Sequence, residues 1–153
     1  MGSNEKKLYQ RLKFLSDVFL LSSGPTDHTS YLRTVTKYFK QFTGADASVL
    51  IFNDKNGFLS PVFSLGIPFN KIKNTRMPSS TRLKDILAHP VLDLRYASFM
   101  NTPFIHNRKL LGLSAVFSTV PEKFLLFEQD KYENLLLAML ASYTAVMIEN
   151  LKI

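Results

Sequence analysis

Apolar residues recur along this chain with the spacing of helices at both ends and with the spacing of strands in between. Residues 6–21 and 27–42 carry apolar side chains at positions i, i+3, i+4 and i+7, the pattern of amphipathic helices. Gly24 and Gly44 follow these segments, and glycine is typical of the position just after a helix. A third helical pattern begins near Glu128. We therefore expect two helices before the strands and one after them.

Two pairs of short apolar runs predict two β-hairpins. Residues 47–52 and 58–65 flank a polar turn rich in Asn and Gly. Residues 98–106 and 110–118 flank a second polar turn of hairpin length. Strands joined in this way pair antiparallel, so the chain is expected to form an antiparallel sheet with helices packed on it.

Individual residues within these segments restrict their surroundings. Pro61 cannot donate a backbone hydrogen bond, so its strand is expected at a sheet edge. Gly112 stands in an otherwise bulky strand and predicts the close approach of another backbone or of a helix. Residues 66–97, which we call the roof segment, combine Gly and Pro with basic side chains and predict a loop with a short helix over 81–88.

The last helix is apolar nearly all round. Between Leu135 and Ile148 the polar groups are Ser142, Thr144 and the Tyr143 hydroxyl. Such a helix must be covered on more than one side. We expect the sheet on one side, and on the other either the N-terminal helix or a second copy of the protein. Because the helical pattern continues to the last residue, we also expect the chain to be a module of a longer protein.

Composition indicates one globular domain covering residues 1–153, with 46% hydrophobic and 20% charged residues. Residues 1–7 are expected to be disordered or to be an addition to the natural chain. The sequence has no Cys, which excludes disulfides, thiolate metal sites and thiol nucleophiles. The longest strongly apolar run, residues 135–146, is too short to cross a bilayer, and the N-terminus lacks a signal-peptide pattern, so we expect a cytoplasmic protein without membrane insertion.

The positive charge is concentrated in one stretch. The net charge of the chain is +7, and residues 66–109 contain 8 basic and 2 acidic residues. A localised basic stretch favours an anionic ligand, an acidic partner or nucleic acid. The alternative is a solvated surface that keeps the protein soluble.

No residue pattern indicates an enzyme. There is no Gly-rich phosphate loop, no H-E-x-x-H and no G-x-S-x-G motif. The three histidines, His28, His89 and His106, are far apart in the sequence and are assigned to a helix start, a helix end and a turn. We expect no metal site, no haem and no catalytic activity.

Three motifs resemble those of the GAF domain family. SFMNTPF at residues 98–104 is similar to its S-x-l-x-v-P-l strand, and LGLSAV at 111–116 is similar to its i-G-v-l-x-l strand. FEQD at 127–130, followed by the apolar run and residues 141–150, resembles its last helix. The order of elements also agrees, over about residues 8–151. The rival assignments are a PAS-type or a profilin-like α/β sandwich.

The resemblance implies an α+β fold: a central antiparallel sheet of five to six strands, with the N- and C-terminal helices on one face and the roof segment covering a small-molecule pocket on the other. It also implies a homodimer through the helices between Lys6 and Leu21 and between Leu135 and Leu151. Covalent bilin attachment is excluded because it needs Cys. The cofactor, if there is one, stays unknown.

A ligand site is expected between the roof segment and the sheet. Four cations would hold an anionic ligand, a histidine falls in the roof, two phenylalanines would line the pocket, and an asparagine would orient the ligand from the sheet. These residues are Arg76, Arg82, Lys84, Arg95, His89, Phe63, Phe99 and Asn101.

We therefore expect a small-molecule-binding sensory or regulatory module of a bacterial signal-transduction protein, which signals to an attached output domain through its terminal helices. One alternative is a dimerisation or interaction module without a ligand, whose pocket is filled by its own side chains. Nucleic-acid binding through the basic stretch is a third reading, although no helix-turn-helix or base-stacking signature supports it.

Overall fold

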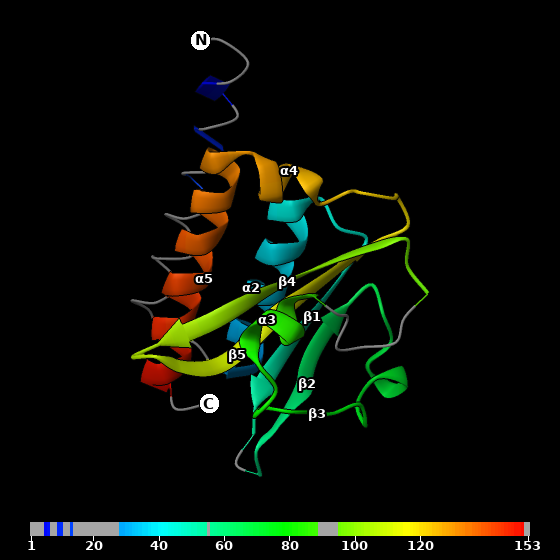
Figure 1. Ribbon diagram of the computed structural model, residues 1–153, viewed down its shortest axis with the longest axis vertical. Helices are drawn as coiled ribbons and strands as arrows, with labels where there is room; N and C mark the ends of the chain where they lie inside the picture. Colours follow the sequence, from blue (N-terminus) through cyan, green and yellow to red (C-terminus); the bar gives the residue numbers. More distant parts are fainter. Residues whose placement is uncertain are drawn as a thin grey trace.

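The computed structural model describes residues 5–6, 9–10, 13, 28–54, 56–88 and 95–151. In these residues a five-stranded antiparallel sheet carries long helices on one face and short irregular segments on the other (Figure 1). This α+β arrangement is the fold expected from the sequence. The helix expected between Lys6 and Leu21 lies outside the described residues for most of its length.

The sheet has the strand order β3-β2-β1-β5-β4, so its outer strands are β3 and β4. Its strands are β1 (Ala47–Asn53), β2 (Phe58–Leu65), β3 (Met77–Pro78), β4 (Ser98–His106) and β5 (Lys109–Ser118). Both predicted hairpins are confirmed. The β4–β5 turn places Asn107 and Arg108 at φ 51° and 65°, which suits the right-handed twist of a hairpin.

The structure explains why the strands contain Pro61 and Gly112, residues that strands usually avoid. β3 pairs only with Phe58 and Leu59, so the rest of β2, including Pro61, lies beside an open stretch of the sheet edge. The register between β1 and β2 shifts next to Pro61. Gly112 pairs with Phe52 of β1, and a Cβ at this position would overlap the carbonyl oxygen of Ile51. The close backbone approach predicted for Gly112 is confirmed.

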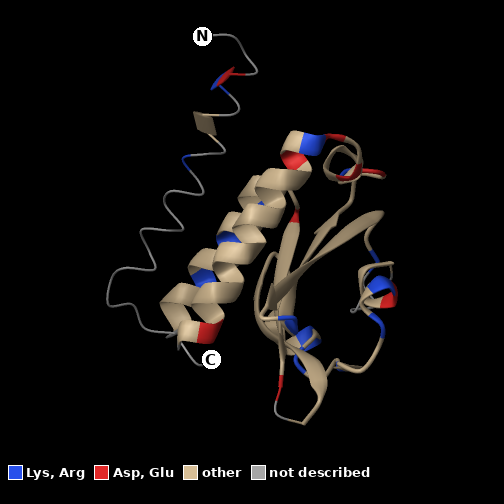
Figure 2. Cartoon of the chain, turned by 60° about the vertical axis from the view of Figure 1, so that its left-hand side comes forward, with Lys and Arg blue, Asp and Glu red and all other residues tan. Residues whose placement is uncertain are grey.

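The helix layer consists of α2 (His28–Thr43), α4 (Leu125–Gln129) and α5 (Lys131–Leu151), and α2 and α5 lie along one face of the sheet (Figure 2). α2 directs its apolar stripe at the sheet: Tyr31, Val35, Phe39 and Phe42 are all buried. Phe39 contacts Phe104 of β4, with ring centroids 5.5 Å apart. Large aromatic side chains therefore hold α2 against the sheet.

The opposite face of the sheet has a second apolar cluster. The short helices η1 (Phe69–Lys71) and α3 (Leu83–Ala88) belong to the roof segment, and α3 begins two residues later than predicted. Ile67, Ile72 and Ile86 from this segment pack with inward-facing strand residues such as Leu113. Because β1 contributes to both clusters, its residues from Ala47 to Phe52 are buried.

The last helix was predicted as one element beginning near Glu128, and this prediction is wrong. The chain forms α4, breaks at Asp130, and begins again as α5. Asp130 has an extended backbone, and its Oδ1 accepts hydrogen bonds from the N–H groups of Tyr132 (2.9 Å) and Glu133 (3.2 Å). Asp130 thus caps α5, which ends the preceding helix and begins the next one.

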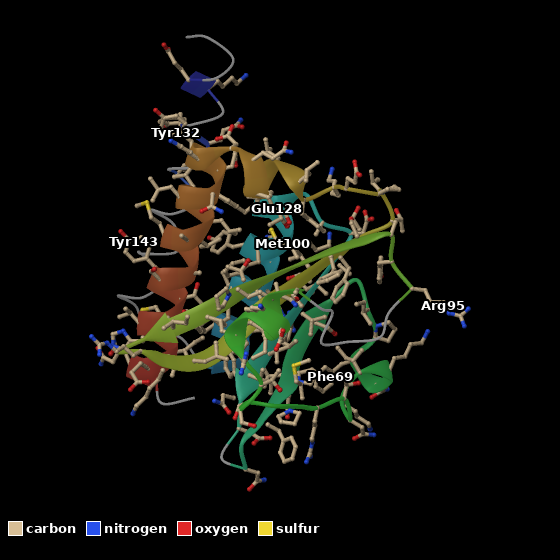
Figure 3. The ribbon with its side chains drawn as sticks, in the orientation of Figure 1. Phe69, Arg95, Met100, Glu128, Tyr132 and Tyr143 are labelled. Atoms are coloured by element: carbon tan, nitrogen blue, oxygen red, sulfur yellow. The ribbon has the colours of Figure 1, made fainter. Side chains whose placement is uncertain are left out.

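The apolar residues of α5 divide between two faces. Leu136, Leu137 and Leu140 are buried against the sheet and α2. On the outer face, Leu135 is 56% exposed and Val146 is 40% exposed. Figure 3 shows Tyr132 and Tyr143 projecting from α5 away from the sheet. In the described part of the chain, this outer face is left uncovered. None of the described helices has the length and hydropathy needed to span a membrane.

Asp46 joins the start of β1 to the end of β5, and we expect it to make stability pH-dependent. The Thr119 N–H (2.8 Å) and hydroxyl (3.0 Å) and the Ser118 hydroxyl (3.3 Å) donate to its Oδ2. These hydrogen bonds lower the pKa of the Asp46 carboxyl below its ordinary value. The contribution of these hydrogen bonds to the free energy of unfolding is therefore complete above the unfolded-state pKa of about 3.9. It is lost as the pH falls through the lower folded-state pKa.

Asp46→Asn should consequently lower Tm at neutral pH and reduce the further loss of Tm on acidification. Thermal melts between about pH 7 and pH 2.5, which bracket the ordinary carboxyl pKa, would measure both effects. Thr119→Val removes one donor and retains the backbone N–H, so it should act in the same direction by less. An Asp46→Asn melting profile parallel to that of the wild type would contradict this assignment.

Candidate ligand groove at the sheet edge

A groove of about 630 Å³ runs along the outer edge of β4. β4 supplies five consecutive residues, from Phe99 to Pro103, and then Ile105. Consecutive strand residues point to opposite faces of a sheet. The groove therefore follows the edge itself, with one wall on each side of the sheet, and does not lie on a single face. We call it the β4 groove.

The position of β4 in the sheet explains why this edge is open. β4 pairs with β5 on its inner side and is the last strand in the sheet order. Pro103 fits such a strand because proline cannot donate to a neighbouring strand. Leu87 and Ala88 of α3 form one wall, and α4 and α5 form the other. The sheet edge thus lies at the bottom of a space between two helical walls.

Two asparagine side chains hold these walls in place. Asn101 is buried, and its Nδ2 donates to the carbonyl oxygen of Ile86 at 2.8 Å, which joins β4 to α3. Asn134 Nδ2 donates to the carbonyl oxygen of Phe127 at 2.9 Å, which joins α5 to α4. Hydrogen bonds from side chains to backbone fix the relative position of two elements more narrowly than apolar contact does. Both walls are thus preorganised.

The lining is mostly apolar and carries a single charged side chain among the described residues, the exposed carboxylate of Glu128. Phe99, Met100 and Leu137 supply apolar surface, and Thr102 and Ser142 supply hydroxyl groups. Figure 3 shows Met100 and Glu128 between β4 and α4. An apolar concavity with a few polar groups is the usual form of a small-molecule site.

Two of the eight predicted site residues line this groove: Phe99 and Asn101. His89 lies outside the described residues. Phe63 lies on the face of the sheet that α2 and α5 cover, where it packs against the apolar cluster of that face. Its ring centroid is 5.9 Å from the guanidinium carbon of Arg33. The irregular register of β2 beside Pro61 accounts for this placement, because one extra residue reverses the side to which the following side chains point.

The four predicted cations do not converge on a site. Arg76, Arg82, Lys84 and Arg95 are all exposed, and none of them lines the β4 groove. Arg95 points away from the sheet (Figure 3). In Figure 2 the basic positions of the roof segment, coloured blue, lie on the side of the sheet opposite α5. The structure therefore places these charges in solvent, because the inner side of this segment is apolar.

The space expected between the roof segment and the sheet is filled. Ile72, Ile86 and Leu113 are almost completely inaccessible to solvent, and Tyr96 packs against Phe117 with ring centroids 5.4 Å apart. In the described part of the chain, protein side chains thus occupy the place where the sequence predicted a ligand.

Sequence reasoning missed the contribution of α4 and α5 to the groove. Asn134, Ala138, Ala141 and Ser142 face β4 from one side of α5. They are small or polar residues at helical spacing within an otherwise bulky apolar helix, and this interruption was visible in the sequence. Glu128, from α4, was assigned only to a helix start.

A second cavity of about 600 Å³ lies between the turns at one end of the sheet and the last turn of α5. Asn53, Asp54 and Lys109 face Ile148 and Glu149 across it. It has less apolar surface than the β4 groove, so the β4 groove is the better candidate. Among the described residues, no three His, Asp or Glu side chains come close enough together to hold a metal ion.

The comparisons with known proteins concern the fold. No protein-family model matches the sequence, and no curated protein matches it. The GAF domain of an Acinetobacter phosphoenolpyruvate-protein phosphotransferase superimposes with a TM-score of 0.73 at 15% identity, over 99% of this chain and 96% of that domain. The GAF domain of a Coxiella burnetii phosphoenolpyruvate-protein phosphotransferase gives a TM-score of 0.69 at 18% identity, over 93% and 94%.

A third similar structure is the GAF-B domain of DevS from Mycobacterium smegmatis, with a TM-score of 0.59 and 14% identity over 82% of this chain and 96% of that domain. Identities this low establish the fold alone. The chain has a GAF-like fold, as its sequence motifs indicated.

Proposed function

We propose that this GAF-like chain is a sensory or regulatory module of a bacterial signalling protein, and that it binds a small molecule in the β4 groove. The observation that carries the proposal is that one groove is lined by both the sheet edge and α5. We further propose that the module is non-catalytic, works in the cytoplasm and is attached to an output domain. The GAF-like fold, shared with domains of larger proteins, supports this reading.

The proposed signal passes through α5. Leu137, Ala138 and Ala141 line the groove, while Leu135 and Tyr143 lie on the outer face of the same helix. A ligand between β4 and α5 would favour one packing of the helix against the sheet over another. Small shifts of a packed helix are a common means of transmitting a binding event to an interface.

The outer face of α5 is the proposed dimer interface. Tyr132, Leu135, Met139 and Val146 follow one another at intervals of three, four and seven residues, the spacing of a helix-pairing seam. Leu135 and Val146 are exposed in the single chain. A second copy would remove this apolar surface from water. The proposed partner segment between Lys6 and Leu21 lies outside the described residues for most of its length.

Ala138→Trp is expected to abolish ligand retention. Ala138 is exposed and lines the groove, so an indole at this position can occupy the groove without entering the protein core. Native mass spectrometry of freshly purified protein should show a retained small molecule on the wild type and none on this variant. Asn150→Trp adds the same side chain to α5 at an exposed position outside the groove lining and should retain the molecule.

Leu135→Glu is expected to raise the dimer dissociation constant by about tenfold or more, because it places an uncompensated charge in an apolar interface. Analytical ultracentrifugation at several concentrations would measure the change. Leu126→Glu makes the same substitution at an exposed leucine of α4, outside the proposed interface, and should leave the dissociation constant unchanged. An unchanged dissociation constant in the Leu135→Glu variant would show that the outer face of α5 is not the dimer interface.

The second candidate is a dimerisation module without a ligand. It is favoured by the apolar cluster that fills the space beneath the roof segment. This candidate predicts that the wild type and Ala138→Trp each show the mass of their own two polypeptides and no added small molecule, which would contradict the proposal of a sensor.

A further inference from the structure

We infer that the β4 groove binds organic amines, molecules with an apolar body and one protonated amino group, and disfavours carboxylates and phosphates. The juxtaposition that leads to this inference is an apolar trough with the carboxylate of Glu128 in its lining. The inference rests on the ligand-binding function proposed above and specifies the ligand class. It differs from the expectation based on the basic sequence stretch, which favoured an anion.

The body of the ligand is argued from the walls of the groove. Phe99 and Leu87 face the trough from the side of α3, and Met100, Leu137 and Ala141 face it from the side of α5. An apolar group placed between these walls is removed from water, and so is the apolar surface of the walls that it covers. This burial is the main favourable term in binding to such sites. The volume of about 630 Å³ accommodates an aromatic ring with an alkyl chain.

The charge of the ligand is argued from the single ionic group of the described lining. Glu128 is exposed and carries a carboxylate, and no Lys, Arg or His side chain belongs to that lining. The N-terminus of α5, which could otherwise attract an anion, already receives the Asp130 carboxylate. A protonated amine near Glu128 gains an opposite charge, whereas a carboxylate would meet a like charge.

Hydrogen-bonding capacity points the same way. The amide nitrogens of Asn101 and Asn134 already donate to backbone carbonyl oxygens within the protein. Pro103, in the edge strand, has a carbonyl oxygen and no N–H group. The Glu128 carboxylate can only accept hydrogen bonds, and the Thr102 and Ser142 hydroxyls can accept as well as donate. An ammonium group supplies three donors and no acceptor, which complements such a lining.

Three probes with one skeleton test the inference: 4-phenylbutylamine, 4-phenylbutanol and 4-phenylbutyrate, titrated into the ¹⁵N-labelled full chain and followed by NMR. We expect shifts in β4, α4 and α5, with the amine binding about fivefold more tightly than the carboxylate and the alcohol between them, as befits an exposed charge. A carboxylate that binds as tightly as the amine would overturn the ligand class and leave the ligand function standing. Failure of all three to bind would overturn the groove as a ligand site, and the proposed function with it.

Glu128→Gln assigns the charge preference to one residue. It should weaken amine binding about threefold and leave alcohol binding unchanged, since only the amine is charged. Glu122→Gln makes the same change in an exposed residue outside the groove lining and should change neither affinity. Equal amine affinities for the wild type and Glu128→Gln would overturn the role given to Glu128.

Discussion

Phe39→Ala is expected to lower the free energy of unfolding by about 4 kcal/mol, the typical cost of removing a buried ring and leaving a cavity. Phe39 is completely buried on the sheet-facing side of α2 and contacts Phe104 of β4. α5 also packs into this cluster, so the ring lies where helix layer and sheet meet. Chemical denaturation monitored by circular dichroism would give the difference.

Phe69→Ala is the matched control for Phe39→Ala. Phe69 lies in η1 and is 39% exposed, so its truncation should cost less than about 1 kcal/mol. A loss of similar size in both variants would show that the aromatic contact between α2 and β4 does not dominate the helix-face core.

Gly112→Ala is expected to lower the free energy of unfolding by about 3 kcal/mol, because the added methyl group has no room. Alanine ordinarily suits a strand at least as well as glycine does, so propensity alone predicts a small gain. Here the new Cβ would overlap the carbonyl oxygen of Ile51 and lie 3.1 Å from Phe52 Cα. Both neighbours are backbone atoms of β1, so relief requires β1 and β5 to separate.

Denaturant unfolding of Gly112→Ala would measure this loss. Lys109→Ala, at an exposed position of the same strand, should change the free energy of unfolding by less than about 0.5 kcal/mol. A stability of Gly112→Ala equal to that of the wild type would contradict the close packing of β1 against β5.

The secondary structure could be predicted because each element has a local pattern. The stripe on α2 and the turns of both hairpins specify their elements without reference to the rest of the chain. The break at Asp130 was harder to see, since the acidic residues around it suit the first turn of one helix as well as a cap between two. The close approach of another backbone at Gly112 could be predicted because a glycine in a bulky strand leaves space where a side chain would be.

The site was harder to predict because it depends on which strand ends the sheet. Local pairing joins β4 to β5, but the position of β4 at the edge follows from the pairing of β1 with β5, which are far apart in the sequence. The basic stretch was read as a pocket lining, yet the isoleucines between its charges turn inward and leave Arg76 and Arg82 in solvent. Charge per segment does not specify which side of the backbone carries it.

The placement of the groove changes the route by which a ligand would act. A pocket beneath the roof segment would be separated from the helix layer by the whole sheet. The β4 groove contacts α5 directly through Leu137 and Ala138, and the outer face of the same helix is the proposed dimer interface. Binding and signalling would therefore share one helix.

Hydrogen–deuterium exchange of the full chain, with and without saturating 4-phenylbutylamine, tests this coupling most directly. The account predicts slower exchange in β4 and also in α5, because a ligand between them would stabilise the packing of both. Ala138→Trp should show no ligand-dependent change, and Asn150→Trp should behave as the wild type does. Unchanged exchange in both elements, or protection confined to segments outside the groove, would contradict the account.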